Sequence, residues 1–272
     1  MIIIADAGSS KIDWAVLDTE TSHYQSEGWN PTQHQKALVI NNKDLKTHLL
    51  NCTELHYYST GAGTSLGIDR AIKELKKYCP AAQINVHGDL LGAARALFKD
   101  TEGIAIIIGT GSNVCYYDGQ EIKFKTPSLG YLLSDEGSGF AMGKDILKAF
   151  FYNKMPADTS QLFLDKYAIT KTKLFEIIYS SPRPNASIAA YASFLKSVDN
   201  EWKRKLIYKN FEILIQEKIL PHKNFLSVPI GFVGSIAKAY HDILEEVCSS
   251  YDIKNIKIIA RPLDALITYH HE

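Results

Sequence analysis

Two stretches of this sequence match each other, Ile2-Ile3-Ile4-Ala5-Asp6-Ala7-Gly8-Ser9-Ser10 and Ala105-Ile106-Ile107-Ile108-Gly109-Thr110-Gly111-Ser112-Asn113, with Gly8 aligned on Gly111. In each, an aliphatic run meets a loop of small polar residues, which predicts a buried strand that ends in a tight turn. A further strand ending in aspartate follows each loop. A strand followed by glycine is common enough to match by chance, but the matched residues are small and polar. Two such hairpins facing each other would offer backbone N–H groups and hydroxyls to one polyphosphate.

Outward from these stretches, strands alternate with amphipathic helices in both halves of the chain. Strands are predicted at 2–5, 12–17, 55–59, 83–87, 104–108, 114–118, 121–125, 225–232 and 256–260. Helices are predicted at 69–78, 89–98, 140–152, 159–167, 171–179, 186–197, 200–217, 235–247 and after Pro262. This order of elements predicts an α/β fold with a mixed sheet in each of two lobes.

The composition is that of an ordinary globular protein. The chain has 272 residues, of which 46% are hydrophobic and 22% charged, and its 30 basic residues balance its 30 acidic ones. It therefore has no overall positive field to hold a nucleic acid or an anionic membrane surface. The N-terminus has no basic segment and no long apolar segment, so we expect no leader there. No apolar run reaches about 18 residues, so we expect no segment that spans a membrane. The expected location is the cytoplasm.

The four cysteines are scattered through the chain and form no CxxC pair. Their spacing argues against a structural zinc site and against an iron–sulfur cluster held within this chain. Four cysteines in a chain of this length also make no disulfide scaffold, so we expect reduced thiols. They are Cys52, Cys79, Cys115 and Cys248.

Several motifs resemble those of the actin/Hsp70/sugar-kinase superfamily. Residues 6–11 resemble its first phosphate loop, residues 109–112 its second, and Gly231-Phe232-Val233-Gly234-Ser235 its adenosine motif. Within the superfamily the sequence is most similar to the BadF/BadG-type ATPase family, the group that contains N-acetylglucosamine kinase. The segments that carry this likeness are Gly28-Trp29-Asn30-Pro31, Gly88-Asp89-Leu90-Leu91-Gly92-Ala93-Ala94, Ile108-Gly109-Thr110-Gly111-Ser112-Asn113 and Gly130-Tyr131-Leu132-Leu133-Ser134-Asp135-Glu136-Gly137-Ser138.

The resemblance implies a two-lobed actin-like ATPase fold, ribonuclease H-like, with a central cleft. The N-terminal lobe would span 1–100, with 262–272 packing back on it, and the C-terminal lobe would span 101–261. The implied activity is that of an ATP-dependent sugar kinase, which phosphorylates a hydroxyl of an amino sugar. N-acetylglucosamine is the first candidate for this sugar. The partners implied are the sugar and ATP with Mg²⁺, without nucleic acid or membrane, and the analogy also implies a homodimer.

Asp6 directly follows the first strand. A carboxylate there can hold a hydrated Mg²⁺ that offsets phosphate charge, or it can bond its own loop amides. Glycines in the two loops let the backbone approach a phosphate closely, and the hydroxyls and one lysine add donors. The resemblance implies phosphate contacts for Asp6, Gly8, Ser9, Ser10, Lys11, Gly109, Thr110, Gly111 and Ser112, adenosine contacts for Gly234 and Ser235, and a magnesium role for Asp6, through water.

Asp89 opens an Ala-rich helix. Phosphoryl transfer to an alcohol needs a carboxylate that accepts the hydroxyl proton, and aspartate before a helix is also a good N-cap. Spacing alone favours the cap, whereas the position in the family pattern implies the catalytic base. One carboxylate oxygen can cap while the other faces the substrate.

Amides and carboxylates suit the hydroxyls of a hexose, each of which is both donor and acceptor. The resemblance implies sugar contacts for Asn30, Asp89, Thr110, Asn113 and Asp135, with Glu136 as a weaker candidate. From the residues alone, Asn30 and Asn113 are also typical of turns, and Asp135 of a helix N-cap.

Three other functions stay open at this point. One is a kinase for glucosamine or another hexose. Another is an ATPase activator of the 2-hydroxyacyl-CoA dehydratase type, which shares the phosphate loops but carries cysteines for a bridging iron–sulfur cluster. The third is a sugar-binding regulator with an inactive kinase site.

Overall fold

The computed structural model describes residues 1–32, 37–223 and 225–271. The chain divides into two compact units. The first consists of Met1–Glu102, Tyr117–Ile122 and Arg261–Glu272, and the second of Gly103–Tyr116 and Lys123–Ala260. Each unit has its own five-stranded sheet.

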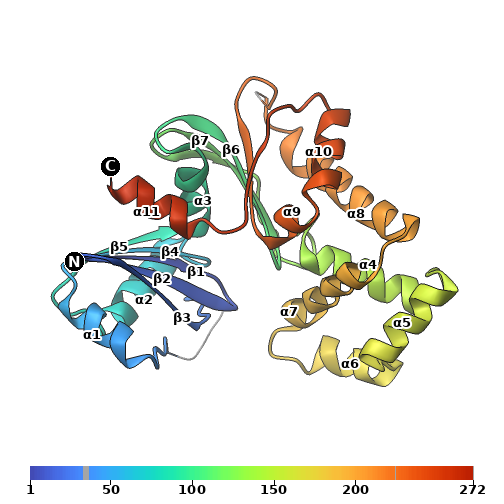
Figure 1. Cartoon of the computed structure of the whole chain (residues 1–272), viewed down its shortest axis with the longest axis horizontal. Helices are drawn as coiled ribbons and strands as arrows, with labels where there is room; N and C mark the ends of the chain where they lie inside the picture. Colours follow the sequence, from blue (N-terminus) through green and yellow to red (C-terminus); the bar gives the residue numbers. More distant parts are fainter. Residues whose placement is uncertain (33–36, 224, 272) are drawn as a thin grey trace. The chain divides into compact units, whose positions relative to one another are not determined.

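The sheet of the first unit has the strand order β3-β2-β1-β4-β5 (Figure 1). Its strands are β1 (Ile2–Ala7), β2 (Lys11–Leu17), β3 (Thr21–Glu27), β4 (Glu54–Ser59) and β5 (Gln83–Gly88). β1 is antiparallel to β2 and parallel to β4, with Asp6 opposite Asp13 in the hairpin. The sheet is therefore mixed, and β1 lies at its centre.

Helices cover this sheet because its central strands carry apolar side chains on both faces. Ile3 and Ala5 belong to one core cluster with Leu45 and Leu49. On α3, Gly92 packs so closely that a Cβ there would meet the Tyr58 ring at 2.9 Å. The helices of this unit are α1 (Lys43–Asn51), α2 (Ser65–Leu75), α3 (Asp89–Phe98) and α11 (Leu263–His271).

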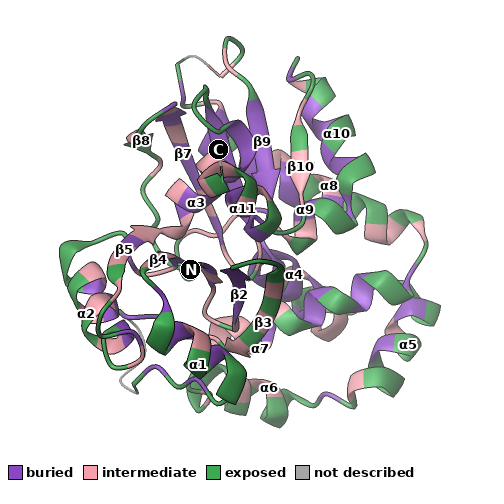
Figure 2. Ribbon diagram, turned by 60° about the vertical axis from the view of Figure 1, so that its left-hand side comes forward, coloured by how far each residue is buried: buried purple, intermediate pink, exposed green. Residues whose placement is uncertain are grey.

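The sheet of the second unit has the strand order β10-β9-β6-β7-β8, and β6, β9 and β10 run parallel. Its strands are β6 (Glu102–Ile108), β7 (Ser112–Asp118), β8 (Ile122–Lys125), β9 (Ile230–Val233) and β10 (Lys257–Ile259). All four residues of β9 are buried (Figure 2). Its helical elements are α4 (Gly139–Phe151), α5 (Ala157–Tyr167), α6 (Lys171–Tyr179), α7 (Pro184–Ala189), the 3₁₀ helix η1 (Ala190–Ser197), α8 (Glu201–Leu214), the π-helix η2 (Ile215–Ile219), α9 (Ser235–Ala239) and α10 (His241–Ser250).

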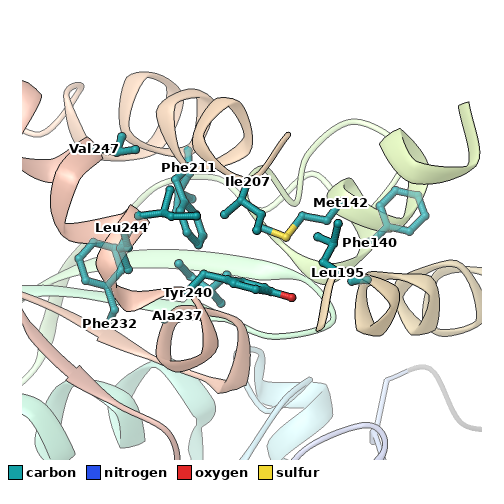
Figure 3. Packing of buried hydrophobic residues seen from close by; sticks show 14 of the residues in the cluster. Phe140, Met142, Leu195, Ile207, Phe211, Phe232, Ala237, Tyr240, Leu244 and Val247 are labelled. Carbon is teal, nitrogen blue, oxygen red and sulfur yellow. The ribbon is translucent and has the colours of Figure 1, made fainter. Parts of the chain in front are cut away.

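Side chains from five elements meet in the core of the second unit (Figure 3). Met142 of α4, Phe211 of α8, Phe232 of β9, Ala237 of α9 and Leu244 of α10 are each fully buried. Burial of the four larger of these side chains contributes about 1.5–3 kcal/mol each, so this cluster stabilises the unit.

The predicted alternation of strands and helices is confirmed, but several boundaries were wrong. The predicted strand 225–232 begins only at Ile230, because Pro229 lacks an N–H and 225–227 form turns. The helices predicted at 186–197, 200–217 and 235–247 each change type or break, into α7 and η1, α8 and η2, and α9 and α10.

Two elements had no counterpart in the sequence prediction. β3 is an edge strand whose residues Thr21–Glu27 alternate between exposed and half-buried, so it has no hydrophobic alternation to detect. α1 buries only Leu45 and Leu49. Weak apolar patterning explains both omissions.

Three histidines of the first unit meet between the sheet and α11. The rings of His56 and His270 stack with their centroids 3.7 Å apart, and His87 lies against Tyr58. Tyr58 Oη is 2.9 Å from His270 Nε2 and accepts a hydrogen bond from Arg95. Burial is the largest cause of a lowered pKa at all three histidines, to about 4 at His87 and about 3 at His270.

This cluster predicts a loss of stability in mild acid. In the unfolded chain the imidazoles take up protons below about pH 6.5, whereas in the folded protein they stay neutral. The contribution of these histidines to the free energy of unfolding is therefore fully present above pH 6.5 and is lost as the pH falls toward 4. Asp6, whose pKa is raised to about 7, acts in the opposite direction over part of this range. His270→Phe isolates the histidine contribution, because it keeps a stacked ring that cannot titrate.

Urea unfolding at pH 7.5 and pH 5 is the measurement. We expect wild type to lose about 1 kcal/mol more unfolding free energy than His270→Phe between the two pH values, after allowance for solvent screening. Equal losses in the two proteins would contradict the prediction.

Candidate functional site

The first predicted phosphate loop is a hairpin between β1 and β2. Gly8 N donates to Lys11 O at 2.9 Å, and Gly28 N donates to Ser10 O at 3.2 Å. A Cβ on Gly28 would lie 2.3–2.4 Å from backbone atoms of residues 9–11, so only glycine allows this approach. The motif at 28–31 and the loop at 6–11 therefore form one structure.

The Lys11 side chain is paired with another side chain of this hairpin. Its Nζ lies 2.5 Å from Asp13 Oδ2, and Gln25 donates to the other oxygen of Asp13 at 2.7 Å. Burial is the largest single influence and acts to raise the pKa of Asp13, but the hydrogen bonds from Lys11 and Gln25 together outweigh it, so this pKa is lowered. The predicted contact between Lys11 and a phosphate therefore requires Lys11 to share or leave Asp13.

Asp6 lies at the end of β1 in a strongly acidic setting. Burial is the largest cause that raises its pKa to about 7, and the charges of Asp89 and Asp13 add to it. Lys11 and Arg261 oppose this shift only in part. The fold thus brings together Asp6 and Asp89, which the sequence singled out separately. Arg261, just before α11, was not predicted, because 255 residues separate it from Asp6.

Asp89 is the first residue of α3, and Gly88 is the N-cap, without a side-chain capping bond. The N-cap interpretation of Asp89 is therefore wrong by one residue. Its Oδ1 accepts from Leu90 N at 2.9 Å within the first turn, and the side chain is half-buried. This contact orients the carboxylate, and its role as a base stays a prediction.

Asn30 is buried, and its Oδ1 accepts from both the amide and the hydroxyl of Thr32, each at 2.9 Å. This confirms the turn interpretation. A Cβ on Gly61, whose φ is +80°, would lie 2.2 Å from Asn30 Oδ1, so the carboxamide packs on the backbone that follows β4. Sugar binding by Asn30 stays a prediction.

The second predicted phosphate loop links β6 to β7. Gly109 N donates to Gly111 O at 2.9 Å, and the start of α4 returns to the loop through Gly139 N to Gly109 O at 2.8 Å and Phe140 N to Thr110 O at 3.0 Å. Thr110 is exposed. Ser112 Oγ is buried and has no hydrogen-bond partner within the described part of the chain.

Asp135 lies directly on this loop. Its Oδ1 accepts from Ser112 N at 3.0 Å, and a Cβ on Gly111 would meet its carboxylate at 2.7–2.9 Å. Ser138, and not Asp135, is the N-cap of α4, so the N-cap interpretation of Asp135 is wrong. Asn113 Oδ1 accepts from Val114 N at 3.1 Å, but Asn113 is the second residue of β7, so the turn interpretation of Asn113 is wrong.

Lys218, a residue that the sequence did not suggest, acts on the pKa of Asp135. Burial is the main cause that raises its pKa, and the Ser112 amide and the charge of Lys218 lower it, whereas Glu136 raises it. Lys218 lies 3.3 Å from Glu136 Oε2. Nothing local in the sequence around 218 distinguishes this lysine from a surface one.

The predicted adenosine segment joins the same loop. Gly234 has φ +136°, and a Cβ there would lie 2.1 Å from Ile108 O, the residue before the second phosphate loop. Gly234 N donates to Ile259 O at 3.0 Å, and Ser235 begins α9. The second unit thus brings together residues 109–112, Asp135 and residues 234–235.

Within residues 1–32, 37–223 and 225–271, no group of three or more His, Cys, Asp or Glu side chains is arranged to hold a metal ion. In the same residues, no helix is both long and apolar enough to cross a bilayer.

Comparison with solved structures gives full-length likenesses. A candidate N-acetylglucosamine kinase from Porphyromonas gingivalis is 31% identical, with 100% of this chain and 99% of that chain covered and a TM-score of 0.89. A second one, from Chromobacterium violaceum, is 14% identical, with 98% of each chain covered and a TM-score of 0.69. A ROK family glucokinase from Streptomyces griseus, in complex with glucose and AMPPNP, is 11% identical over 98% of this chain and 97% of that one, with a TM-score of 0.51.

No protein-family model and no curated protein matches the sequence. The two structures with lower identity are likenesses of fold. Together with the two five-stranded sheets, the structural likenesses confirm the predicted two-lobed actin-like α/β fold class.

Proposed function

Because this chain belongs to the family of actin-like sugar kinases that includes the Porphyromonas gingivalis protein, we propose that it transfers the γ-phosphate of ATP to a hydroxyl of an amino sugar, with N-acetylglucosamine as the first candidate. The observation that carries the proposal is the contact of Asp135 with Gly111 and Ser112. This contact supports a site in which a residue that binds the sugar lies beside a loop that binds phosphate. The narrower BadF/BadG assignment remains part of the proposal.

In this proposal the nucleotide and the sugar bind to the residues that the sequence analysis identified as candidates. The phosphates bind to Gly8, Ser9, Ser10, Lys11, Gly109, Thr110, Gly111 and Ser112, adenosine binds near Gly234 and Ser235, and the sugar binds to Asn30, Thr110, Asn113, Asp135 and Glu136. The buried hydroxyl of Ser112, which lacks a described partner, supports a ligand oxygen near this loop.

Asp89 acts as the base. Its carboxylate accepts the proton of the sugar hydroxyl as that oxygen attacks the γ-phosphorus, and the bond to the bridging oxygen of ADP breaks. The interaction with Leu90 N restricts the orientation of the side chain before substrate arrives. The expected products are ADP, the sugar phosphate and the proton on Asp89.

The acidic setting of Asp6 fits a bound cation. Its pKa is raised by burial and by two neighbouring carboxylates, so a positive charge nearby would stabilise the ionised form. One or two carboxylates with water and substrate phosphates are the usual ligands of Mg²⁺ in such sites. Asp6 would hold Mg²⁺ through water, and the ion would offset the charge of the ATP phosphates.

We expect Asp6→Asn to lower kcat/KM for Mg·ATP by about 10–100-fold, because an amide cannot replace the negative charge that attracts the ion. Steady-state kinetics over a titration of Mg²⁺ is the measurement. Asp18→Asn is the matched control, since Asp18 is an exposed carboxylate of the same unit. If Asp6→Asn needs no more Mg²⁺ than the control, Asp6 does not serve the ion.

The substrate is tested by ADP release with Mg·ATP and glucosamine, N-acetylglucosamine, N-acetylmannosamine or glucose. We expect the highest kcat/KM with N-acetylglucosamine. If only a different hexose is turned over, that hexose replaces N-acetylglucosamine as the proposed substrate. Sugar binding measured by calorimetry without any turnover would favour the regulator with an inactive kinase site.

The four cysteines weigh against the dehydratase activator. All four are buried, whereas a cluster that bridges two chains needs thiolates at the surface. We expect the purified protein to be colourless and free of iron.

A further inference from the structure

Lys218 is a buried lysine of the second unit that the sugar-kinase proposal has not yet used. It lies in η2, the π-helical turn that follows α8, and its side chain is only 4% exposed. Its Nζ donates to Ser134 Oγ at 2.6 Å and pairs with Glu136 Oε2 at 3.3 Å. Ser134 Oγ also donates to Glu136 Oε2 at 3.3 Å, so the three side chains close a small network.

The backbone of Lys218 holds a second point of the same segment. Its carbonyl accepts from Thr126 Oγ1 at 3.2 Å, and Thr126 Oγ1 is also 3.0 Å from His222 Nε2. Carbonyls at the end of a helix lack helical partners, which leaves this one available. Thr126 directly follows β8, and two residues separate 134–136 from α4, which begins at Gly139. Lys218 therefore contacts both ends of the segment that connects β8 to α4.

Asp135 lies between the two residues that Lys218 holds. Its φ is +69°, a left-handed conformation that residues other than glycine adopt only at an energetic cost and keep only where the surroundings enforce it. Contacts that enforce it include the Ser112 amide on its carboxylate, the Ser138 amide on its carbonyl, and the bonds that Lys218 makes to its two neighbours.

We propose that Lys218 is a positioning residue for the sugar site, which holds Ser134 and Glu136 so that the Asp135 carboxylate stays on the second phosphate loop. The part of this proposal that concerns the sugar rests on the proposed function. The part that concerns the placement of Asp135 rests on contacts within the second unit alone.

Charge supports this role. Among the described residues, the charged groups that act on Asp135 are Lys218, from η2, and Glu136, from its own segment. Lys218 lowers the pKa of Asp135 and Glu136 raises it. Removal of the lysine charge is therefore expected to raise this pKa, and removal of the glutamate charge to lower it.

The two opposite variants are Lys218→Met and Glu136→Gln, with Lys209→Met as the matched control on the exposed surface of α8. The probe is the amide resonance of Ser112, which donates to Asp135, followed by NMR over a pH titration. We expect the midpoint to rise by about one pH unit in Lys218→Met, to fall in Glu136→Gln and to stay unchanged in Lys209→Met. Midpoints that move in the same direction, or not at all, would overturn the proposal.

If Lys218→Met does not fold, Glu136→Gln decides alone: a lowered midpoint supports the proposal and an unchanged one overturns it. Lys218→Arg, which keeps the charge, is expected to retain the wild-type midpoint.

In the kinase assay we expect Lys218→Met to raise the KM for sugar about tenfold while the KM for ATP changes less than about twofold. An equal rise in both would overturn the assignment to the sugar site. An inactive wild-type protein would defeat the proposed function, but the NMR titration would still decide whether Lys218 positions Asp135.

Discussion

Asp89→Asn is expected to lower kcat for sugar phosphorylation by about 10²–10⁴-fold while the affinity for ATP stays similar. Asparagine has nearly the same shape and keeps the oxygen that accepts from Leu90 N, so the first turn of α3 is retained. It cannot take up the proton of an attacking hydroxyl. The change thus separates the base from the local structural role.

The measurement is the single-turnover rate with Mg·ATP and the best sugar, together with nucleotide binding by calorimetry. Asp69→Asn, at an exposed carboxylate of α2 in the same unit, serves as the control. Unchanged turnover in Asp89→Asn would mean that Asp89 only orders the start of α3.

Gly234→Ala is expected to destabilise the second unit by about 3 kcal/mol or more and to abolish nucleotide binding. The backbone at 234 has φ +136°, which a residue with a Cβ adopts only under strain. The added Cβ would also lie 2.1 Å from Ile108 O, a backbone atom of the central strand β6 that cannot move aside as a side chain can.

Urea unfolding of the two proteins tests this prediction. The control is Gly63→Ala, because a Cβ on Gly63 would meet nothing within 4 Å. A loss in Gly234→Ala that is no larger than in Gly63→Ala would refute the steric argument.

The sequence predicted the fold well where local patterns are strong. The aliphatic runs at 2–5 and 104–108 became β1 and β6, and the helix expected at 89–98 is α3. Apolar periodicity and glycine-containing turns carry enough information for such elements. The polar edge strand β3 and the π-helical end of α8 depend on neighbours distant in sequence, so no local pattern marked them.

The candidate site divides in the same way. Gly8, Gly111 and Asp6 stand out because they lie at or just beyond the ends of buried strands. Lys218 and Arg261 do not, because their significance comes from contacts that only the folded chain makes. Lys218 lies 84 residues from Ser134, and in the sequence it resembles any solvated lysine of an amphipathic helix. Long-range electrostatic partners of this kind require the structure.

The burial of all four thiols also makes the molecule suitable for site-specific labelling. Each cysteine is at most 3% exposed, so a maleimide should leave the folded protein unmodified. A single cysteine introduced at an exposed position of either unit would then carry the only reporter dye, and a pair of them, one in each unit, would follow changes in distance during turnover by energy transfer without removal of any native residue.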